Sequence, residues 1–389
     1  MSKTVSPSIA LVYDRVNTPH GGAENVLLAL HQAFPTAPLF TALYHPKTTA
    51  WAQQFPAVYP SFLNKLPLLR SLHRWLAWLM PLAFESFDLK AFDIVISVTS
   101  AEAKGIITHP HQLHLCYLLT PPRYLYQDRE HSLASHWLLR LPLVHQLAQL
   151  WLNYLTWWDQ AAIFRPDAVI PISRRVANRI KQYYPALKSR PVIYPPVDVI
   201  TTQTTLPHPF QGQSYFLSIS RLVSHKHLDL AIKACARLKQ NLVIVGEGPE
   251  LARLQRIAAA TADQHQVVFL SSVDNQQLQA LYTHCQALLM PGEEDFGIVA
   301  LEANAFGKPV IINQNSGAAE LIKPSVHGIY LADGTVEAVV TALQKFNQTQ
   351  FFTHTLRQNS LKYGTNNFIR AFVSTVKEAW KTYQTKYDQ

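Results

Sequence analysis

Glycine and cysteine are both scarce in this chain of 389 residues. There are 13 glycines, where an average usage of about 7% would give roughly 27. Nine of the 13 lie between Gly246 and Gly364, and we expect them where the backbone excludes a side chain. The three cysteines form no Cys-x-x-Cys pair. Their pattern therefore argues against a disulfide framework or a zinc cage and favours a reducing cytosol.

Charged residues make up only 15% of the chain, and long apolar runs are missing too. The first 14 residues contain too short an apolar stretch for a signal peptide. The segment Trp137–Trp158 includes Arg140, Pro142 and several amides, so we interpret it as amphipathic rather than membrane-spanning. A hydrophobic content of 48% excludes a disordered chain. The formal charge of +9 favours anionic partners such as nucleotides, phospholipids or nucleic acid.

Short apolar runs alternate with helical patterns along the whole chain. The expected strands of the first half are 9–13, 94–98, 113–119, 168–172 and 192–194. Those of the second half are 216–220, 242–245, 267–270, 287–290 and 309–312. This alternation predicts α/β domains with parallel sheets and helices on both faces. We predict a first domain over 1–195, a polar linker over 196–213, a second domain over 214–365 and a last helix over 366–387.

The segment from Met290 to Pro309 is the most specific motif. Gly297 is predicted to begin a helix, so the free N–H groups at this helix end form an anion site, with Phe296, Ile298 and Val299 beside it. Glu294 and Glu302 lie on either side of that site and could accept hydrogen bonds from sugar and ribose hydroxyls. The alternative interpretation is a solvated acidic loop.

This segment resembles the donor-site signature of retaining glycosyltransferases of family 4, through Glu294, Glu302 and the following Gly307-Lys-Pro-Val. The resemblance implies the GT-B fold, in which two Rossmann-like, doubly wound parallel-sheet domains face a central cleft. It also implies that Glu294 contacts the transferred sugar and Glu302 the ribose of the nucleotide. The last helix would cross back to the N-terminal domain, which binds the acceptor.

Residues 218–232 resemble the arginine–lysine segment of the same family. The resemblance makes Arg221 and Lys226 the cations that hold the donor diphosphate, and with Glu294 they form the predicted catalytic set. Negative charge grows on the leaving phosphate as the glycosidic bond breaks, and fixed cations stabilise that transition state. The alternative is an ordinary pair of surface cations at a helix start.

Three weaker motifs complete the predicted donor site. Gly246-Glu-Gly-Pro-Glu-Leu lacks the third glycine of a dinucleotide fingerprint, because Leu251 occupies its place, and this disfavours a nicotinamide oxidoreductase. The motif resembles the family turn beside the nucleotide, although a tight turn without ligand is an equal alternative. Asp274 is expected near the base. Gly21 and Gly22 resemble the loop that approaches the donor phosphate, or form an ordinary turn.

Further resemblance to O-antigen-type mannosyltransferases of bacteria is found in 80–88, 100–105 and 116–126. It implies retaining transfer of a hexose, with mannose from GDP-mannose as the best match, to a lipid-linked oligosaccharide in surface polysaccharide synthesis. No Asp-x-Asp pair is present, and the resemblance implies neither a metal nor a cofactor. Nucleic acid is not an expected partner.

Two features keep alternatives open. Many relatives have a histidine where this chain has Leu119, which supports a non-catalytic scaffold that binds a sugar nucleotide; His109 and His111 are the nearest replacements. Six of the eight tryptophans lie between Trp75 and Trp158. The apolar segments there either pack on the sheet or lie in the bilayer interface of the cytoplasmic membrane. We expect a cytoplasmic protein, with peripheral contact to that membrane in the second case.

Overall fold

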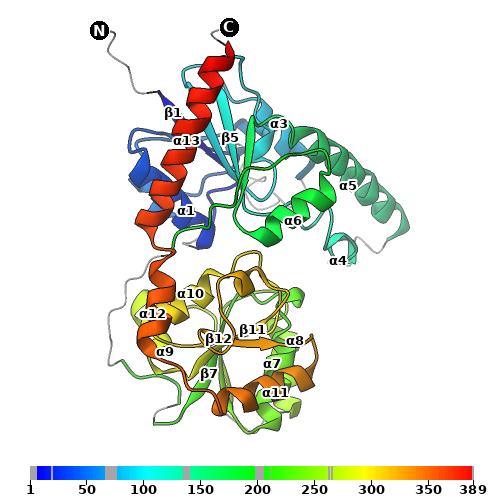
Figure 1. The fold of residues 1–389 in the computed structure, drawn as a ribbon. Coiled ribbons are helices and arrows are strands. Elements are labelled where there is room, and N and C mark those ends of the chain that lie inside the picture. Colours follow the sequence, from blue (N-terminus) through cyan, green and yellow to red (C-terminus); the bar gives the residue numbers. More distant parts are fainter. Residues whose placement is uncertain are drawn as a thin grey trace. The chain divides into compact units, whose positions relative to one another are not determined.

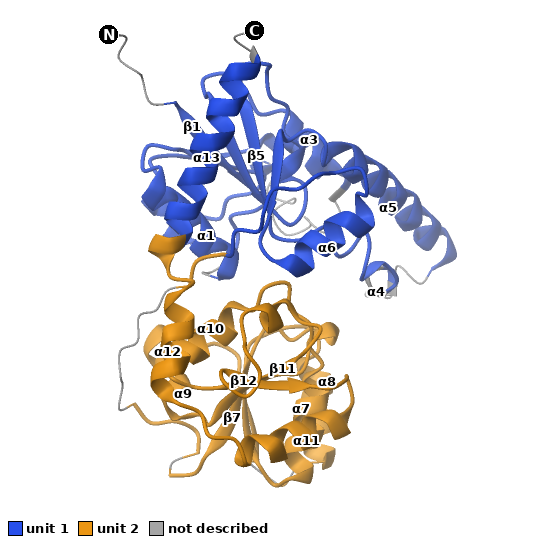
Figure 2. Ribbon diagram, in the orientation of Figure 1, with its two compact units in different colours: residues 1–194, 368–389 blue, residues 195–367 orange. Residues whose placement is uncertain are grey.

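The computed structural model describes residues 7–18, 21–65, 77–134, 141–197, 206–210, 212–261, 263 and 266–387. The chain forms two compact units (Figure 2). Unit 1 contains Met1–Tyr194 and Phe368–Gln389, and unit 2 contains Pro195–Asn367. The polar segment 196–213 belongs to unit 2. Its residues 198–205 and 211 fall outside the described part, and its described residues are in no helix or strand.

Unit 1 is built on a six-stranded parallel sheet in the order β3-β2-β1-β4-β5-β6. Its strands are β1 (Ile9–Tyr13), β2 (Leu39–Thr41), β3 (Val58–Pro60), β4 (Ile94–Thr99), β5 (Leu113–Leu118) and β6 (Ala168–Pro171). Every residue of β4 and β5 is buried. These mostly apolar strands are typical of strands covered on both faces, as parallel sheets require.

The helices of unit 1 connect and cover these strands (Figure 1). They are α1 (Gly22–Ala33), α3 (Met80–Glu85), α4 (Arg129–Ala134), α5 (Pro142–Ala162), α6 (Arg174–Tyr183) and most of α13 (Thr365–Tyr387). Short 3-10 helices are η1 (Ala50–Gln54), η2 (Phe62–Lys65), η3 (Ala77–Leu79) and η4 (Ala103–Gly105). The predicted last helix is confirmed as α13. It packs on the sheet through Phe368 and Phe372, whose rings contact Tyr117 of β5.

Unit 2 repeats the architecture with the strand order β12-β11-β10-β7-β8-β9, again all parallel. Its strands are β7 (Tyr215–Ile219), β8 (Asn241–Val245), β9 (Val267–Leu270), β10 (Ala287–Met290), β11 (Val310–Asn313) and β12 (Gly328–Leu331). Its helices are α7 (Leu228–Arg237), α8 (Leu251–Thr261), α9 (Asn275–His284), α10 (Ile298–Ala305), α11 (Val336–Asn347), α12 (Thr353–Leu361), η6 (Ser224–Lys226) and η7 (Gly317–Glu320).

The helices of unit 2 lie on both faces of its sheet. Helix α7 packs between α8 and α11, while α10 packs against α12 (Figure 1). The apolar face of α7, including Ile232 and Cys235, joins Leu242, Ile244 and Leu289 of the sheet in one buried core. The two doubly wound α/β sheets predicted from the alternating pattern are therefore confirmed.

One predicted strand is wrong, and three strands of the structure were not predicted. Residues 192–194 are not a strand, because prolines at 191, 195 and 196 remove the N–H donors that a ladder needs. Ile193 donates one hydrogen bond to the Pro171 carbonyl and remains irregular. The sequence analysis did not identify β2 and β3, which have three residues each, or β12, which begins with Gly328. Such short runs carry too little periodicity to stand out.

Candidate functional site

Lys226 and Glu294 meet where the strand order of unit 2 reverses. Lys226 ends η6 in the loop after β7, and Glu294 lies in the loop after β10. These strands are neighbours in the sheet, and the chain winds outward from them in opposite directions. Lys226 Nζ lies 2.5 Å from Glu294 Oε1. Ligands of doubly wound sheets bind at this reversal, outside the carboxyl ends of the strands.

Two loops must approach each other closely to form this ion pair. A Cβ atom at Gly292 would collide with the Cα atom of Lys226, so only glycine allows the contact. The loop carrying Glu294 is also fixed from the other side. The Glu294 N–H donates to Ser316 Oγ (3.0 Å), and the Gly317 N–H donates to the Glu294 carbonyl (2.7 Å). The position of Glu294 is therefore set by backbone contacts as well as by Lys226.

A small pocket opens beside the ion pair. It is lined by residues at the ends of β7 and β10 and in the segments that follow them, namely Ser218, Ile219, Ser220, Lys226, Leu228, Leu289, Met290, Pro291, Gly292 and Glu294. Its volume of about 10 Å³ accommodates about one water molecule. It can hold a single chemical group of a larger ligand, with a cation and a carboxylate at its rim.

Helix α10 begins next to this loop. Gly297 is its N-cap with φ of 91°, a left-handed conformation that side chains disfavour, and a Cβ atom there would collide with Ala318. Phe296 is buried, whereas Ile298 and Val299 in the first turn are half-buried. The N–H groups of Ile298 and Val299 precede the first hydrogen bond of the helix, in which the Ala300 N–H donates to the Gly297 carbonyl (3.0 Å). The helix end therefore presents its N–H groups as the sequence predicted, while their role toward a ligand stays a prediction.

Glu302 is held by a residue that the sequence analysis missed. Tyr282 of α9 donates its hydroxyl proton to Glu302 Oε2 at 2.7 Å, and its ring stacks on Phe306 at 5.2 Å. Burial, and next the negative charge of Glu302, raise the pKa of Tyr282 well above its usual value, so the hydroxyl stays a donor. Little in the sequence indicates the Tyr282–Glu302 contact, because an isolated tyrosine in a helix most often packs in a core.

The remaining predicted donor residues of unit 2 lie on neighbouring loops. Arg221 follows β7 and is exposed, and within the described residues its guanidinium has no hydrogen-bond or ion-pair partner. Gly246 follows β8, where a Cβ atom would collide with the carbonyl of Ser220. Asp274 caps α9: its carboxylate accepts from the Gln277 N–H at 2.7 Å in a capping box. The structure thus assigns Asp274 a local structural role.

Gly21 and Gly22 belong to unit 1, whereas the other predicted donor residues belong to unit 2. Gly21 caps α1, and the buried carboxylate of Glu24 lies in the first turn of that helix. Glu24 accepts hydrogen bonds from the hydroxyls of Tyr13 (3.1 Å) and Thr18 (3.2 Å). Because this negative charge already occupies the helix start, it opposes a phosphate there.

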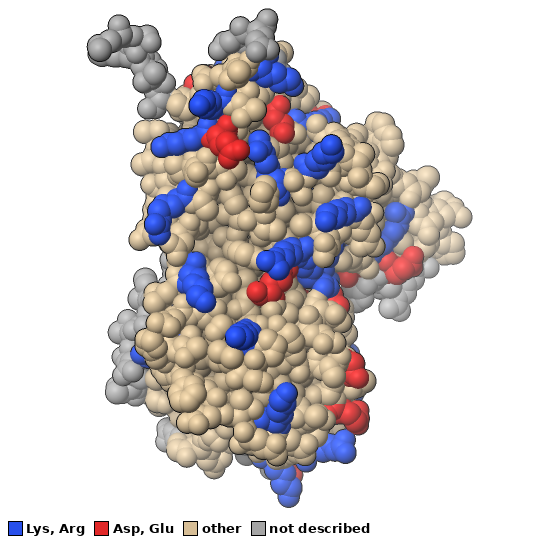
Figure 3. Space-filling view, viewed as in Figure 1, with Lys and Arg blue, Asp and Glu red and all other residues tan. Residues whose placement is uncertain are grey.

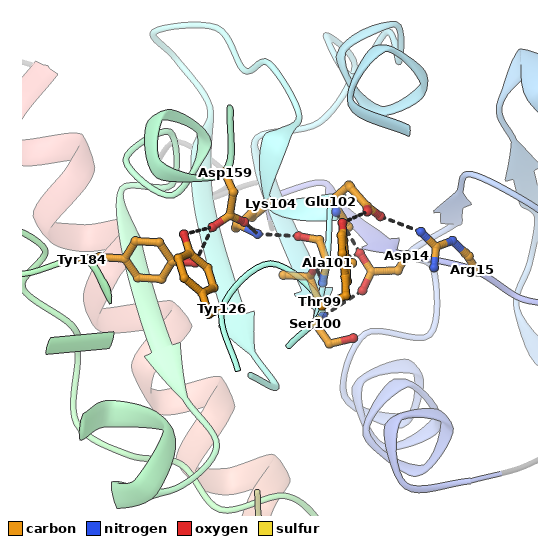
Figure 4. Close-up of polar contacts among 12 residues, drawn as sticks. Asp14, Arg15, Thr99, Ser100, Ala101, Glu102, Lys104, Tyr126, Asp159 and Tyr184 are labelled. Atoms are coloured by element: carbon orange, nitrogen blue, oxygen red, sulfur yellow. Dashed lines mark hydrogen bonds and ion pairs between the residues drawn. The ribbon is translucent and has the colours of Figure 1, made fainter. Parts of the chain in front are cut away.

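A buried charged network follows the corresponding strand reversal of unit 1, between β1 and β4 (Figure 4). Asp14 accepts from the Thr99 hydroxyl (2.7 Å) and from the N–H groups of Ser100 and Ala103 (2.8 Å each). Arg15 pairs with Glu102 at 2.8 Å. The Asp14 carboxylate fixes the loop after β4, and the Arg15–Glu102 ion pair fixes the part of that loop just before η4.

The other half of this network joins Lys104 and Asp159, both almost completely buried, at 2.6 Å (Figure 4). The hydroxyls of Tyr126 and Tyr184 donate to the same carboxylate. The Asp159 charge raises the pKa of both tyrosines, after burial, which is the larger cause. Several donors and one cation therefore compensate the buried carboxylate.

His109 and His111 lie at the other end of β5 from Leu119, so neither takes the place of the family histidine. Leu119 follows the carboxyl end of β5, whereas His109 and His111 precede the strand. His114, within β5, bonds to the Ser97 hydroxyl at 2.8 Å, and burial lowers its pKa to about 3. Among the described residues, no group of three or more His, Cys, Asp or Glu side chains could hold a metal ion.

Comparison with known proteins relates the described geometry to a family. Residues 207–366 match the family model described as Glycosyl transferases group 1. A GDP-mannose-dependent alpha-(1-6)-phosphatidylinositol monomannoside mannosyltransferase of Mycolicibacterium smegmatis is 35% identical over 139 residues, covering 32% of this chain and 36% of that protein. The chain spans less than half the length of the curated relatives it matches.

Solved structures resemble the chain over both units. The Anabaena protein HepE in complex with UDP has a TM-score of 0.67 at 17% identity, with 95% of this chain and 99% of that chain covered. Sucrose-phosphate synthase of Thermosynechococcus elongatus has a TM-score of 0.69 at 15% identity, with 96% and 99% covered. The chain therefore has the GT-B fold, and the match to the group 1 glycosyl transferase model falls within its second unit.

Proposed function

We propose that this protein is a retaining glycosyltransferase that transfers mannose from GDP-mannose to a lipid-linked oligosaccharide. The observation that carries the proposal is the Lys226–Glu294 pair at the strand reversal of unit 2, beside the N-terminus of α10. A cation, free N–H groups and carboxylates at one place match the chemical demands of a nucleotide diphosphate sugar.

Each group has a separate role in the proposed reaction. Lys226, Arg221 and the N–H groups at Gly297 bind the diphosphate, while Glu294 accepts from a sugar hydroxyl and Glu302 from a ribose hydroxyl. The bond between the anomeric carbon and the phosphate oxygen breaks as the acceptor oxygen bonds to the same face of that carbon. The acceptor proton passes to the leaving phosphate. Fixed positive charge stabilises the phosphate as its negative charge grows, so this proposal requires no metal.

The choice of donor rests on the comparisons. The mycobacterial relative that matches over 139 residues is named for GDP-mannose, whereas the Anabaena structure holds UDP. We favour GDP-mannose because this relative has the higher identity. Surface polysaccharide synthesis, on the cytoplasmic side of the membrane, is the proposed setting.

A non-catalytic scaffold that binds the same donor is the second candidate. Leu119 favours it, because a leucine side chain cannot donate or accept a proton in the reaction. The retained Lys226–Glu294 pair favours catalysis. The two candidates differ in turnover and agree in donor binding.

A two-step experiment with the full chain separates them. Thermal shift against GDP-mannose, UDP-glucose, UDP-galactose and NADH identifies the donor, because a bound donor raises the melting temperature. Release of GDP with and without an oligosaccharide acceptor then measures hydrolysis and transfer. Stabilisation with turnover supports the enzyme, and stabilisation without turnover supports the scaffold. No stabilisation by any sugar nucleotide would refute both.

A further inference from the structure

The outer side of α5 carries large apolar side chains where a surface helix normally carries charge. Leu143, Leu147, Leu150, Tyr154 and Trp157 are all exposed and recur at steps of three and four residues. Such spacing returns to the same side of a helix. The most exposed are Leu143 (72%), Trp157 (68%) and Leu150 (62%). We call this row the α5 stripe.

The stripe continues onto neighbouring elements of unit 1. Trp78 of η3 stacks on Trp151 of α5 with ring centroids 6.4 Å apart, and both are exposed. Leu82 of α3 is exposed as well. An apolar surface that extends over several elements marks an interaction site, whereas single exposed apolar residues do not.

The stripe also lacks charge. From Leu141 to Trp158 the sequence contains no Lys, Arg, Asp or Glu, and the exposed polar residues there include the amides of Gln146, Gln149 and Asn153. In Figure 3 the projecting end of α5 is mostly tan. Leucine mixed with tryptophan and tyrosine is the composition of helices that lie in the plane of a membrane interface.

The charge of the chain is concentrated on the same unit. Unit 1 contains 22 Lys and Arg against 12 Asp and Glu, whereas unit 2 contains 12 against 13. Blue side chains accordingly outnumber red ones on the face of unit 1 in Figure 3. At the stripe itself, Arg129 of α4 donates to Asn153 of α5 at 2.5 Å. A positively charged unit attracts an anionic surface.

We propose that the α5 stripe binds the surface of an anionic lipid bilayer, with α5 lying in the interface. A second copy of this chain would fit the apolar face less well, because each copy would bring a surplus of ten positive charges on this unit. No helix in the described part of the chain is long and apolar enough to cross a membrane. The inference does not depend on the proposed transfer activity.

Vesicle sedimentation with the full chain tests the proposal. The probe is phosphatidylcholine vesicles, pure or with about one third phosphatidylglycerol. The variant L143Q/L150Q/W157Q changes the three most exposed positions of the stripe. The matched control F352Q/L361Q changes two equally exposed residues of unit 2, Phe352 (60%) and Leu361 (58%).

Wild type and control should bind the anionic vesicles equally, and more weakly as salt rises. The stripe variant should bind about tenfold more weakly or worse. Melting temperatures verify folding, and the single variants L143Q and W157Q replace the triple variant if it unfolds. Absence of vesicle binding by the wild type, or unchanged binding by a folded stripe variant, would overturn the proposal. So would a wild-type dimer that the stripe variant abolishes without any vesicle binding.

Discussion

Lys226 and Glu294 are 68 positions apart in the sequence, yet their charged atoms lie 2.5 Å apart. They come from loops after β7 and β10, which are adjacent strands at the reversal of the unit 2 sheet. The pair orients the cation and the carboxylate toward the same small pocket. The ion pair restricts both side chains, which would lower the cost of ordering them around the proposed donor.

Removal of the proposed donor cations should reduce turnover without unfolding the protein. Lys226→Ala and Arg221→Ala should each lower the rate of transfer by about 10²–10³, because each removes one preorganised positive charge. Lys233→Ala is the matched control, since Lys233 on α7 forms only a 3.9 Å pair with Asp229. Steady-state rates measure the effect, and near-normal turnover of Lys226→Ala would contradict the site.

Tyr282→Phe should weaken donor binding more than it slows the chemical step. The variant keeps the stacked ring and loses the 2.7 Å hydrogen bond to Glu302, so one contact that orients the Glu302 carboxylate for its proposed role is removed. We expect KM for the donor to rise about tenfold, since a hydrogen bond to a charged group contributes ~1.5–3 kcal/mol, while kcat stays similar.

Tyr215→Phe serves as the control for that experiment. Tyr215 is a buried tyrosine of the same unit whose hydroxyl donates to the Leu281 carbonyl at 2.9 Å. Loss of the Tyr215 hydroxyl should reduce stability by about 1 kcal/mol, and loss of the Tyr282 hydroxyl, whose partner is charged, by ~1.5–3 kcal/mol. Equal KM values for both variants would show that Tyr282 has only a structural role.

Gly292→Ala should disturb the fold of the site. A Cβ atom at this position would collide with the backbone of Lys226, so the loops must separate. We expect a loss of about 2 kcal/mol or more and a melting temperature lower by about 5 °C. Gly334→Ala is the comparison, because a Cβ atom there meets nothing within 4 Å. Calorimetry that finds both variants equally stable would contradict the close approach of the two loops.

Lys104→Met should destabilise unit 1 strongly. The substitution leaves the buried Asp159 carboxylate without its cation at 2.6 Å, and breaking a buried pair costs about 3–5 kcal/mol. The double variant Lys104→Met/Asp159→Asn should recover part of that loss, because no buried charge remains. Denaturant unfolding measures both, with the exposed Lys90→Met as the control. A cost below about 1 kcal/mol would mean that the pair is solvated.

His114 should make the protein less stable in mild acid. Burial, and next the positive charge of Arg165, lower its pKa from 6.5 to about 3. Between these values the unfolded chain takes up a proton that the folded chain does not, so stability falls as pH falls below 6.5. At pH 5 this single group should cost about 2 kcal/mol. The difference in stability between pH 7 and pH 5, measured from unfolding curves, should be smaller for His114→Gln than for the wild type. If the difference is the same in both, another group causes the pH dependence.

The sequence alone predicted the alternation of strands and helices, because buried parallel strands such as 94–99 are mostly apolar. It also singled out Arg221, Lys226, Glu294, Gly297 and Glu302 as candidate donor-site residues, since the motifs that contain them are local, and their roles stay predictions. It did not identify β2, β3 and β12, which are too short for a periodic signal. The strand predicted at 192–194 is absent from the structure. The apolar residues of this segment suggested a strand, but the flanking prolines prevent one.

Only the tertiary structure decided which of these residues meet and what holds them. Tyr282 contacts Glu302, and Ser316 contacts the loop that carries Glu294. Nothing in the sequence around Tyr282 or Ser316 indicates these contacts. Likewise, the apolar pattern of α5 is the same whether its residues are buried or exposed. Local patterns follow from periodicity, whereas the partners and exposure of a side chain follow from how the elements pack.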